Sequence, residues 1–250
     1  MCRNSHRFAI LVAAAVLGGA PAWGQTYQIP GPGGLVLTGT LSKPAGSGPF
    51  PAVILFHGLK VYSTYAQTFA AATDHYNRMG IATIAVDWGA AHGMMATASA
   101  GGSNGYRMSV PGSETVVDDA FATNAFLRTL PFIRGDKIFF EGFSYGAGVA
   151  ARVVRDDAAG RPRFAGAIGY SPYCSTYLSG HGFVAPLLLI VPDQTPEGSP
   201  TACLALRGQP NVTVLQVHSS HHDYWEDRDG EPWLASLRDA DTLIAAALAR

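Results

Sequence analysis

The sequence predicts an α/β fold with a mostly parallel, twisted sheet, helices on both faces of that sheet, and an antiparallel N-terminal edge. Short apolar runs rich in Val, Ile and Phe alternate with longer helical patterns, as in sheets built from strand–helix units. These runs are apolar throughout, which indicates that both faces of the sheet are covered. Residues 25–50 differ, because they are rich in Gly, Pro and Thr and are typical of an edge hairpin.

The elements after this hairpin follow from the same patterns. We expect strands at 52–56, 81–86, 137–140, 164–170, 186–191 and 212–217, and helices at 65–79, from Ser113 to about Leu130, at 147–154 and at 233–249. Gly80 closes the first helix, and Ser113 is a candidate N-cap followed by acidic residues. Residues 88–112 form a long irregular stretch, which either borders a functional site or is a surface insertion.

The first 24 residues have the pattern of an export signal. Arg3 and Arg7 precede a short apolar run, and small residues ending in an A-x-G cleavage site at Gly24 follow it. The apolar run is too short for a membrane span. We therefore expect a signal peptide at 1–24, a single domain at 25–250, and a periplasmic or secreted protein. A retained anchoring segment is the alternative.

Charge and cysteine content indicate which partners and which redox compartment the sequence supports. Without the two arginines of the signal, the chain has 15 basic and 18 acidic residues and a net charge of −3. This balance, without a Lys/Arg-dense run, gives no support for nucleic-acid or membrane partners, and the sequence does not indicate an oligomeric state. Cys174 and Cys203 remain after cleavage and are expected either to form a disulfide in an oxidising compartment or to stay as buried thiols.

A nucleophile is expected at Ser144. It lies in a G-x-S-x-G segment, residues 142–146, directly after a predicted strand and directly before a predicted helix. A serine on such a sharp turn projects its hydroxyl from the sheet and leaves the next amide free for an oxyanion. A second G-x-S-x-G segment, around Ser103, has neither a strand before it nor a helix after it, so we interpret it as a loop.

A serine nucleophile requires a base and an orienting acid, and parallel sheets gather such groups at the carboxyl ends of their strands. Asp193 follows the strand at 186–191 and is the expected acid, with Glu197 as the alternative. The base is expected in the segment after the last strand, where His218, His221 and His222 compete.

The oxyanion hole requires two N–H donors. One is expected from Tyr145, at the start of the helix after the nucleophile. The other is expected from Leu59, in the loop after the first core strand, where the sequence reads Phe56-His57-Gly58-Leu59. His57 is expected to shape that turn, or to have an unrelated packing role, and not to act as a base.

With these parts placed, the chain resembles the dienelactone hydrolase-like family of the α/β-hydrolase superfamily, in a variant whose nucleophile is serine instead of cysteine. The resemblance covers most of residues 45–225. It depends on 51–58 (strand plus His-Gly), 86–89, 117–120, 142–146, Asp193, and His222-Asp223-Tyr224, which is similar to the family's His-x-Phe. That last match favours His222 over His221. His92-Gly93 stands where the family often has Arg-Gly.

Together these residues predict a serine hydrolase that cleaves a small-molecule carboxylic ester or lactone through an acyl-enzyme on Ser144, without a metal or organic cofactor. A peptidase or a thioesterase with the same triad, and a catalytically silent binding protein on the same scaffold, are the alternatives. A metal site built from His218, His221, His222 and Asp223 is a further alternative of another class.

Overall fold

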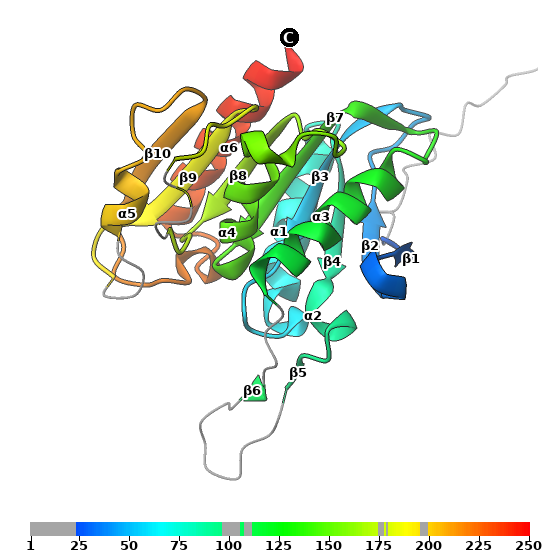
Figure 1. Ribbon diagram of the computed structural model, residues 1–250, viewed down its shortest axis with the longest axis horizontal. Coiled ribbons are helices and arrows are strands. Elements are labelled where there is room, and N and C mark those ends of the chain that lie inside the picture. The colour runs from blue at the N-terminus through cyan, green and yellow to red at the C-terminus, as the bar shows by residue number, and fades with distance from the viewer. Residues whose placement is uncertain (1–23, 97–105, 108–111, 175–177, 179, 196–199) are drawn as a thin grey trace, which may run out of the picture.

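The structure is a computed structural model of the chain, and it describes residues 24–96, 106–107, 112–174, 178, 180–195 and 200–250. Its centre is an eight-stranded sheet in the order β1-β2-β4-β3-β7-β8-β9-β10 (Figure 1). The strands are β1 (Gln25–Pro30), β2 (Val36–Ser42), β3 (Phe50–Phe56), β4 (Ala82–Asp87), β7 (Ile133–Phe143), β8 (Gly166–Tyr170), β9 (Leu187–Pro192) and β10 (Val212–Val217).

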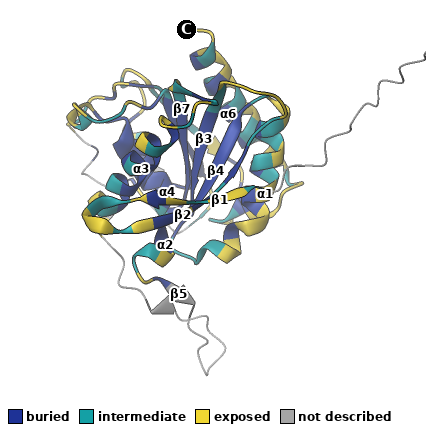
Figure 2. Cartoon of the chain, turned by 90° about the vertical axis from the view of Figure 1, so that its right-hand side faces the viewer, coloured by how far each residue is buried: buried dark blue, intermediate teal, exposed yellow. Residues whose placement is uncertain are grey.

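Six of these strands, from β4 to β10 in the sheet order, are parallel, whereas β1 and β2 form an antiparallel edge. The mostly parallel α/β fold with an antiparallel N-terminal edge is therefore confirmed. The central strands predicted as apolar runs are largely buried on both faces, as the dark strands of Figure 2 show, whereas the edge strand β10 exposes Thr213 and Gln216.

Helices cover the sheet on both sides. One face packs against α1 (Tyr62–Arg78) and α6 (Glu231–Leu248), and the other packs against α3 (Ser113–Leu127) and α4 (Tyr145–Val153). The two layers are separated by the sheet in Figure 1. Among the helices in the described ranges, none is both long enough and apolar enough to cross a membrane.

Several boundaries differ from the predicted ones for local reasons. Helix α3 begins at Ser113, and Gly112 occupies the N-cap position expected for Ser113. Helix α4 begins at Tyr145, two residues early, because the chain turns sharply at Ser144 and enters the helix at once. Within the long stretch after β4, the structure shows α2 (Trp88–Ala91), β5 (Met95–Ala96) and β6 (Tyr106–Arg107).

Some expectations concern segments outside the described residues. These are the body of the proposed signal peptide, the second G-x-S-x-G segment around Ser103, and the alternative acid Glu197. The cysteine prediction does fall on described residues, and Cys174 and Cys203 form a disulfide.

Candidate active site

Ser144 lies on a strained turn between β7 and α4. Its φ of 54° and ψ of −111° are unusual for a residue with a side chain, and such strain is commonly found where a side chain must be presented for chemistry. The Ser144 amide donates to the carbonyl of Tyr170 at the end of β8, 2.9 Å away. The neighbouring strand thus holds the turn in place.

The glycines around Ser144 are required by close backbone approach. A Cβ on Gly142 would lie 2.0 Å from the carbonyl oxygen of Gly146, and a Cβ on Gly146 would lie 2.6 Å from the carbonyl oxygen of Phe56. A Cβ on Gly58 would lie 2.8 Å from the Ser144 Cβ. The turn is therefore packed against its own helix and against the end of β3, and no side chain fits between them.

His222 is the histidine that meets the nucleophile. It lies in the segment after β10, and its Nε2 is 2.9 Å from the Ser144 Oγ, within hydrogen-bond distance. The Ser171 hydroxyl, directly after β8, donates to the His222 carbonyl over 2.7 Å and fixes the backbone of this segment. Two side chains 78 positions apart in the sequence are thus brought into the contact that a serine nucleophile and its base need.

The other polar side chains of this segment make separate contacts. His221 is exposed, and its backbone amide is held by the Ser219 hydroxyl. The His218 Nδ1 lies 3.1 Å from an Asp193 carboxylate oxygen, and Asp223 is bound by Lys60 at 2.5 Å. Within the described residues, the side chains of His218, His222 and Asp223 thus contact three different partners, Asp193, Ser144 and Lys60.

Asp193 lies where the sequence places it, directly after β9, but its carboxylate faces the start of the histidine segment. One oxygen accepts from the Ser219 amide at 3.1 Å and the other contacts His218. The hydrogen bond with His218 keeps the pKa of this carboxyl below its usual value. In the described part of the chain, the Asp193 carboxylate is hydrogen-bonded to these groups and not to His222, and its own amide continues the strand pairing with Val217.

The two oxyanion candidates lie on either side of the nucleophile turn. Tyr145 is the first residue of α4, where a helix has no internal acceptor for its amide and carries a partial positive charge. Leu59 follows Gly58, whose Cα approaches Ser144 so closely that no side chain fits there. Both amides therefore belong to segments that flank Ser144, as an oxyanion hole requires.

His57 is fully buried and holds the loop that contains Leu59. Its Nδ1 lies 2.8 Å from the carbonyl oxygen of Gly58 and 3.1 Å from that of Lys60, while its Nε2 faces the Gly89 amide at 3.3 Å. Nε2 also lies 3.6 Å from an Asp87 carboxylate oxygen at the end of β4. The ring also stacks on Trp88, with centroids 4.7 Å apart. The structure gives His57 the turn-shaping contacts expected of it.

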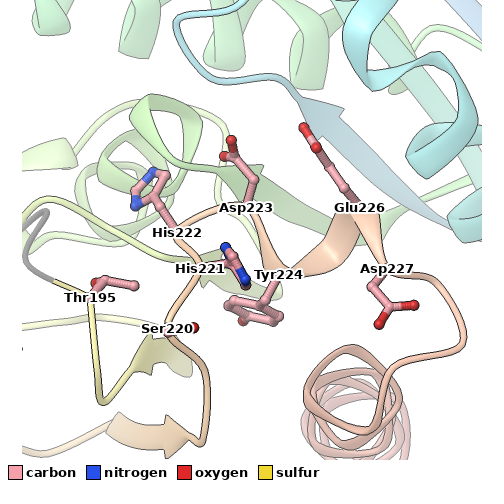
Figure 3. Close-up of a pocket in the computed structure, with 8 residues that line it drawn as sticks. All are labelled: Thr195, Ser220, His221, His222, Asp223, Tyr224, Glu226 and Asp227. Carbon is pink, nitrogen blue, oxygen red and sulfur yellow. The ribbon is translucent and has the colours of Figure 1, made fainter.

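A cavity of about 500 Å³ lies beside the base. Its lining residues all carry polar groups and come from the segment after β10 and from Thr195 (Figure 3): Thr195, Ser220, His221, His222, Asp223, Tyr224, Glu226 and Asp227. The ring of Tyr173, the residue before the disulfide-bonded Cys174, lies 5.4 Å from that of His222. There is thus room for a small molecule next to His222.

Sequence reasoning missed two residues that hold this site together. Ser171 is buried, has a φ of 50°, and anchors the His222 backbone. It directly follows a buried strand, which is the position that yielded the other candidates, so the same rule could have found it. Lys60 binds Asp223 and Glu226 from a distant loop. An isolated lysine in a loop carries no sequence signal for such a contact.

The fold and the serine–histidine contact define the chain as an α/β-hydrolase of the serine type. More specifically, residues 47–201, more than half of the chain, match the family described as serine aminopeptidase S33, and the chain belongs to that family. Among curated proteins, no sequence matches this chain.

Solved structures support the fold over nearly the whole chain. Esterase 2 of Thermogutta terrifontis, in a structure described as phosphorylated by paraoxon, shares 16% identity at a TM-score of 0.69, with 91% of this chain and 95% of that chain covered. An α/β serine hydrolase homologue from Coxiella burnetii shares 17% identity at a TM-score of 0.60, with 86% and 96% covered. At these identities the likeness concerns the fold.

Proposed function

We propose that the protein is a serine hydrolase that cleaves a small carboxylic ester or lactone through an acyl-enzyme on Ser144. The observation that carries the proposal is the 2.9 Å contact between the Ser144 Oγ and the His222 Nε2 at a strained strand-to-helix turn. Esterase chemistry on the same fold, as in the named Thermogutta protein, supports the choice of bond. The likeness to dienelactone hydrolases is part of this proposal, in the form of a serine variant.

The proposed reaction has two stages. His222 takes the proton of the Ser144 hydroxyl as the oxygen attacks the substrate carbonyl carbon, and the amides of Leu59 and Tyr145 stabilise the oxyanion that forms. The alcohol leaves with the proton returned by His222. Water, deprotonated by the same imidazole, then attacks the acyl-enzyme and releases the acid and Ser144. These steps use only groups of this chain and water.

The proposed acid comes from the segment after β9. Asp193 remains the candidate predicted from its place after the strand, and Glu197, four residues later in the same segment, is the alternative. The contacts of Asp193 with Ser219 and His218 give it a second role, in fixing the start of the base segment. Comparison of Asp193→Asn with Glu197→Gln separates the two: loss of the acid lowers kcat about 10⁴-fold, by analogy with serine proteases.

The experiment that tests the function is turnover of p-nitrophenyl acetate and butyrate by the protein and by Ser144→Ala. We expect the substitution to lower kcat by several orders of magnitude while the circular dichroism spectrum is unchanged. A fluorophosphonate probe should label the protein at Ser144 and leave Ser144→Ala unlabelled. Labelling of neither protein, together with unchanged ester turnover, would instead indicate a silent binding protein or a different site.

The family description favours a second candidate, an aminopeptidase with the same catalytic groups. A panel of p-nitrophenyl esters, a γ-lactone, a thioester and aminoacyl p-nitroanilides distinguishes the bonds. We expect the ester and lactone to have the highest kcat/KM. A preference for the anilides would assign the aminopeptidase reaction.

We further propose that residues 1–24 are a cleaved signal and that the mature protein is periplasmic or secreted. The Cys174–Cys203 disulfide supports this location, because such bonds persist in oxidising compartments. N-terminal sequencing of the protein recovered from the periplasm tests it, with Gln25 as the expected first residue.

A further inference from the structure

Lys60 connects the two loops that carry the proposed oxyanion donor and the proposed base. It follows Leu59 in the loop after β3, and its ammonium lies 2.5 Å from an Asp223 carboxylate oxygen and 3.1 Å from a Glu226 carboxylate oxygen. Asp223 is the residue directly after His222. Figure 3 shows Asp223 and Glu226 extending to the same side of the segment, whereas Asp227 points to the opposite side.

This contact differs from an ordinary surface ion pair, which usually contributes little. The Lys60 side chain is 39% exposed and that of Asp223 only 24%. Burial lowers the pKa of the ammonium, but its hydrogen bonds and attraction to the two carboxylates outweigh this and raise the pKa above its usual value. The group therefore stays charged throughout the range in which a histidine titrates.

The backbone of Lys60 is fixed as firmly as its side chain. Its carbonyl accepts from the Nδ1 of the buried His57, and the His57 carbonyl accepts from the Trp88 indole N–H at 3.0 Å. The result is a closed connection: Trp88 and His57 hold the Leu59–Lys60 turn, Lys60 holds Asp223, and His222 next to it contacts Ser144.

We propose that Lys60 is a positioning residue of the hydrolase, which sets the distance between the oxyanion loop and the base and neutralises the carboxylate beside His222. The proposal rests on the proposed function, because it assigns to Lys60 an effect on the base of that reaction. It concerns placement and charge, since no contact links Lys60 to the Ser144 side chain.

The charge around His222 makes the role measurable. Four neighbouring elements place a polar or titratable group against the imidazole or its segment. These groups are Ser144 from the β7–α4 turn, Tyr173 after β8, Asp193 after β9 and Lys60 after β3. The segment itself adds His221, Asp223, Glu226 and Asp227. Removal of Lys60 leaves Asp223 uncompensated, which favours the imidazolium and raises the pKa of the base. Removal of the Asp223 charge leaves the Lys60 ammonium nearby and lowers the pKa of the base.

The test compares Lys60→Met, Lys60→Arg, Asp223→Asn and the double variant Lys60→Met/Asp223→Asn, with p-nitrophenyl butyrate as the substrate across pH 5 to 9. Arg134→Met is the matched control, because Arg134 forms an exposed ion pair with Asp136 near the start of β7, away from its Ser144 end. We expect Lys60→Met to lower kcat about tenfold with KM within twofold of the parent, and Lys60→Arg to retain most of kcat.

The pH profiles carry the decisive result. The acid limb of kcat/KM should move up by about half a pH unit in Lys60→Met and down by a similar amount in Asp223→Asn, and the double variant should return near the parent. Both shifts should shrink in 1 M salt. Acid limbs that coincide with the parent in both single variants, or that move in the same direction, would overturn the proposal, and so would an effect on KM alone.

The result also separates this proposal from the proposed function. If Ser144→Ala retains turnover, the hydrolase assignment itself fails. If Ser144→Ala is inactive while Lys60→Met behaves like Arg134→Met, only the role of Lys60 is wrong. Should Lys60→Met not fold, the downward shift expected for Asp223→Asn, with Lys60→Arg as the retained-charge reference, decides the matter by itself.

Discussion

The nucleophile and the base are held by different forces. Ser144 lies on a turn whose shape is set by backbone packing, since Gly142, Gly146 and Gly58 leave no space for a Cβ. The base segment after β10 is more exposed and is held by individual polar contacts. Ser171 anchors the His222 carbonyl, and Lys60 binds Asp223. The nucleophile turn is thus part of the core, whereas the base segment is attached to the core by polar contacts.

This difference has consequences for substitution. In the turn, a single added methyl group meets backbone atoms that cannot move independently, so the substitution lowers the stability of the folded protein. In the base segment, loss of one hydrogen bond leaves the others in place, so the fold survives and the placement of the imidazole changes. Variants in the two regions should therefore separate stability from turnover.

Gly142→Ala should have the largest effect. Its Cβ would lie 2.0 Å from the Gly146 carbonyl oxygen, and the atoms it meets are backbone. We expect more than about 3 kcal/mol of lost stability, or no soluble protein, measured by urea unfolding.

Gly112→Ala is the matched control. Gly112 precedes α3 with a φ of −54°, and among the described residues, apart from its chain neighbours, no atom lies within 4 Å of the added Cβ. Its cost should stay below about 1 kcal/mol. A Gly142→Ala protein as stable as Gly112→Ala would show that the turn is not locked by packing.

The same division explains what the sequence could predict. The strands and Ser144 follow from apolar runs and a glycine pattern, which depend on neighbours along the chain. His222 was favoured by a family-like tripeptide, and the structure brings it to Ser144. The contacts of Lys60, Ser171 and Asp193 join residues far apart in the sequence through side chains in loops. No periodicity encodes such contacts, so the contact between Asp193 and His218 was not predicted.

Ser171 combines a strained backbone with the anchoring of the base segment. Its φ of 50° is unfavourable for any residue with a Cβ, and its hydroxyl donates to the His222 carbonyl. Ser171→Ala removes the hydrogen bond and keeps the strain, whereas Ser171→Gly removes both. We expect both variants to lower kcat/KM about tenfold, with the glycine variant more stable by about 1 kcal/mol.

Kinetics of the two variants measure the expected loss of kcat/KM, and urea unfolding measures the difference in their stability. Thr242→Ala on α6 is the control, since it also removes a hydroxyl bond to a backbone carbonyl, but at an exposed position where the acceptor is Arg238 of the same helix. Parental turnover in Ser171→Gly would mean that the bond to His222 does not position the base, and that only the strain matters.

The smallest effect on turnover concerns a charge buried on β7, close to the nucleophile turn. Glu141 is fully buried on β7, three residues before Ser144, and accepts a hydrogen bond from the Tyr76 hydroxyl. Its second carboxylate oxygen has no hydrogen-bond partner within the described residues. Burial raises the pKa of this carboxyl to about 7, against the opposing effect of the Tyr76 hydrogen bond.

A raised carboxyl pKa makes the folded protein bind a proton that the unfolded chain has already released. Stability should therefore be highest below the ordinary pKa of 4.5, fall as the pH rises toward 7, and become level above it, with a slope of up to about 1.4 kcal/mol per pH unit. Asp119, whose pKa is raised to about 6 mainly by burial, adds a slope of the same sign. The measurement is therefore the difference in unfolding free energy between the parent and Glu141→Gln at each pH, because both proteins contain Asp119.

We expect Glu141→Gln to flatten the pH dependence of the unfolding free energy between pH 5 and 7, measured by urea titration at pH 5, 6, 7 and 8. Its gain over the parent should be largest at pH 8, where the parent holds a buried charge. Ester turnover should change little, since Glu141 does not contact the reacting pair. Parallel stability curves for the two proteins would show that Glu141 does not titrate in this range, and that the packed half of the site tolerates its charge.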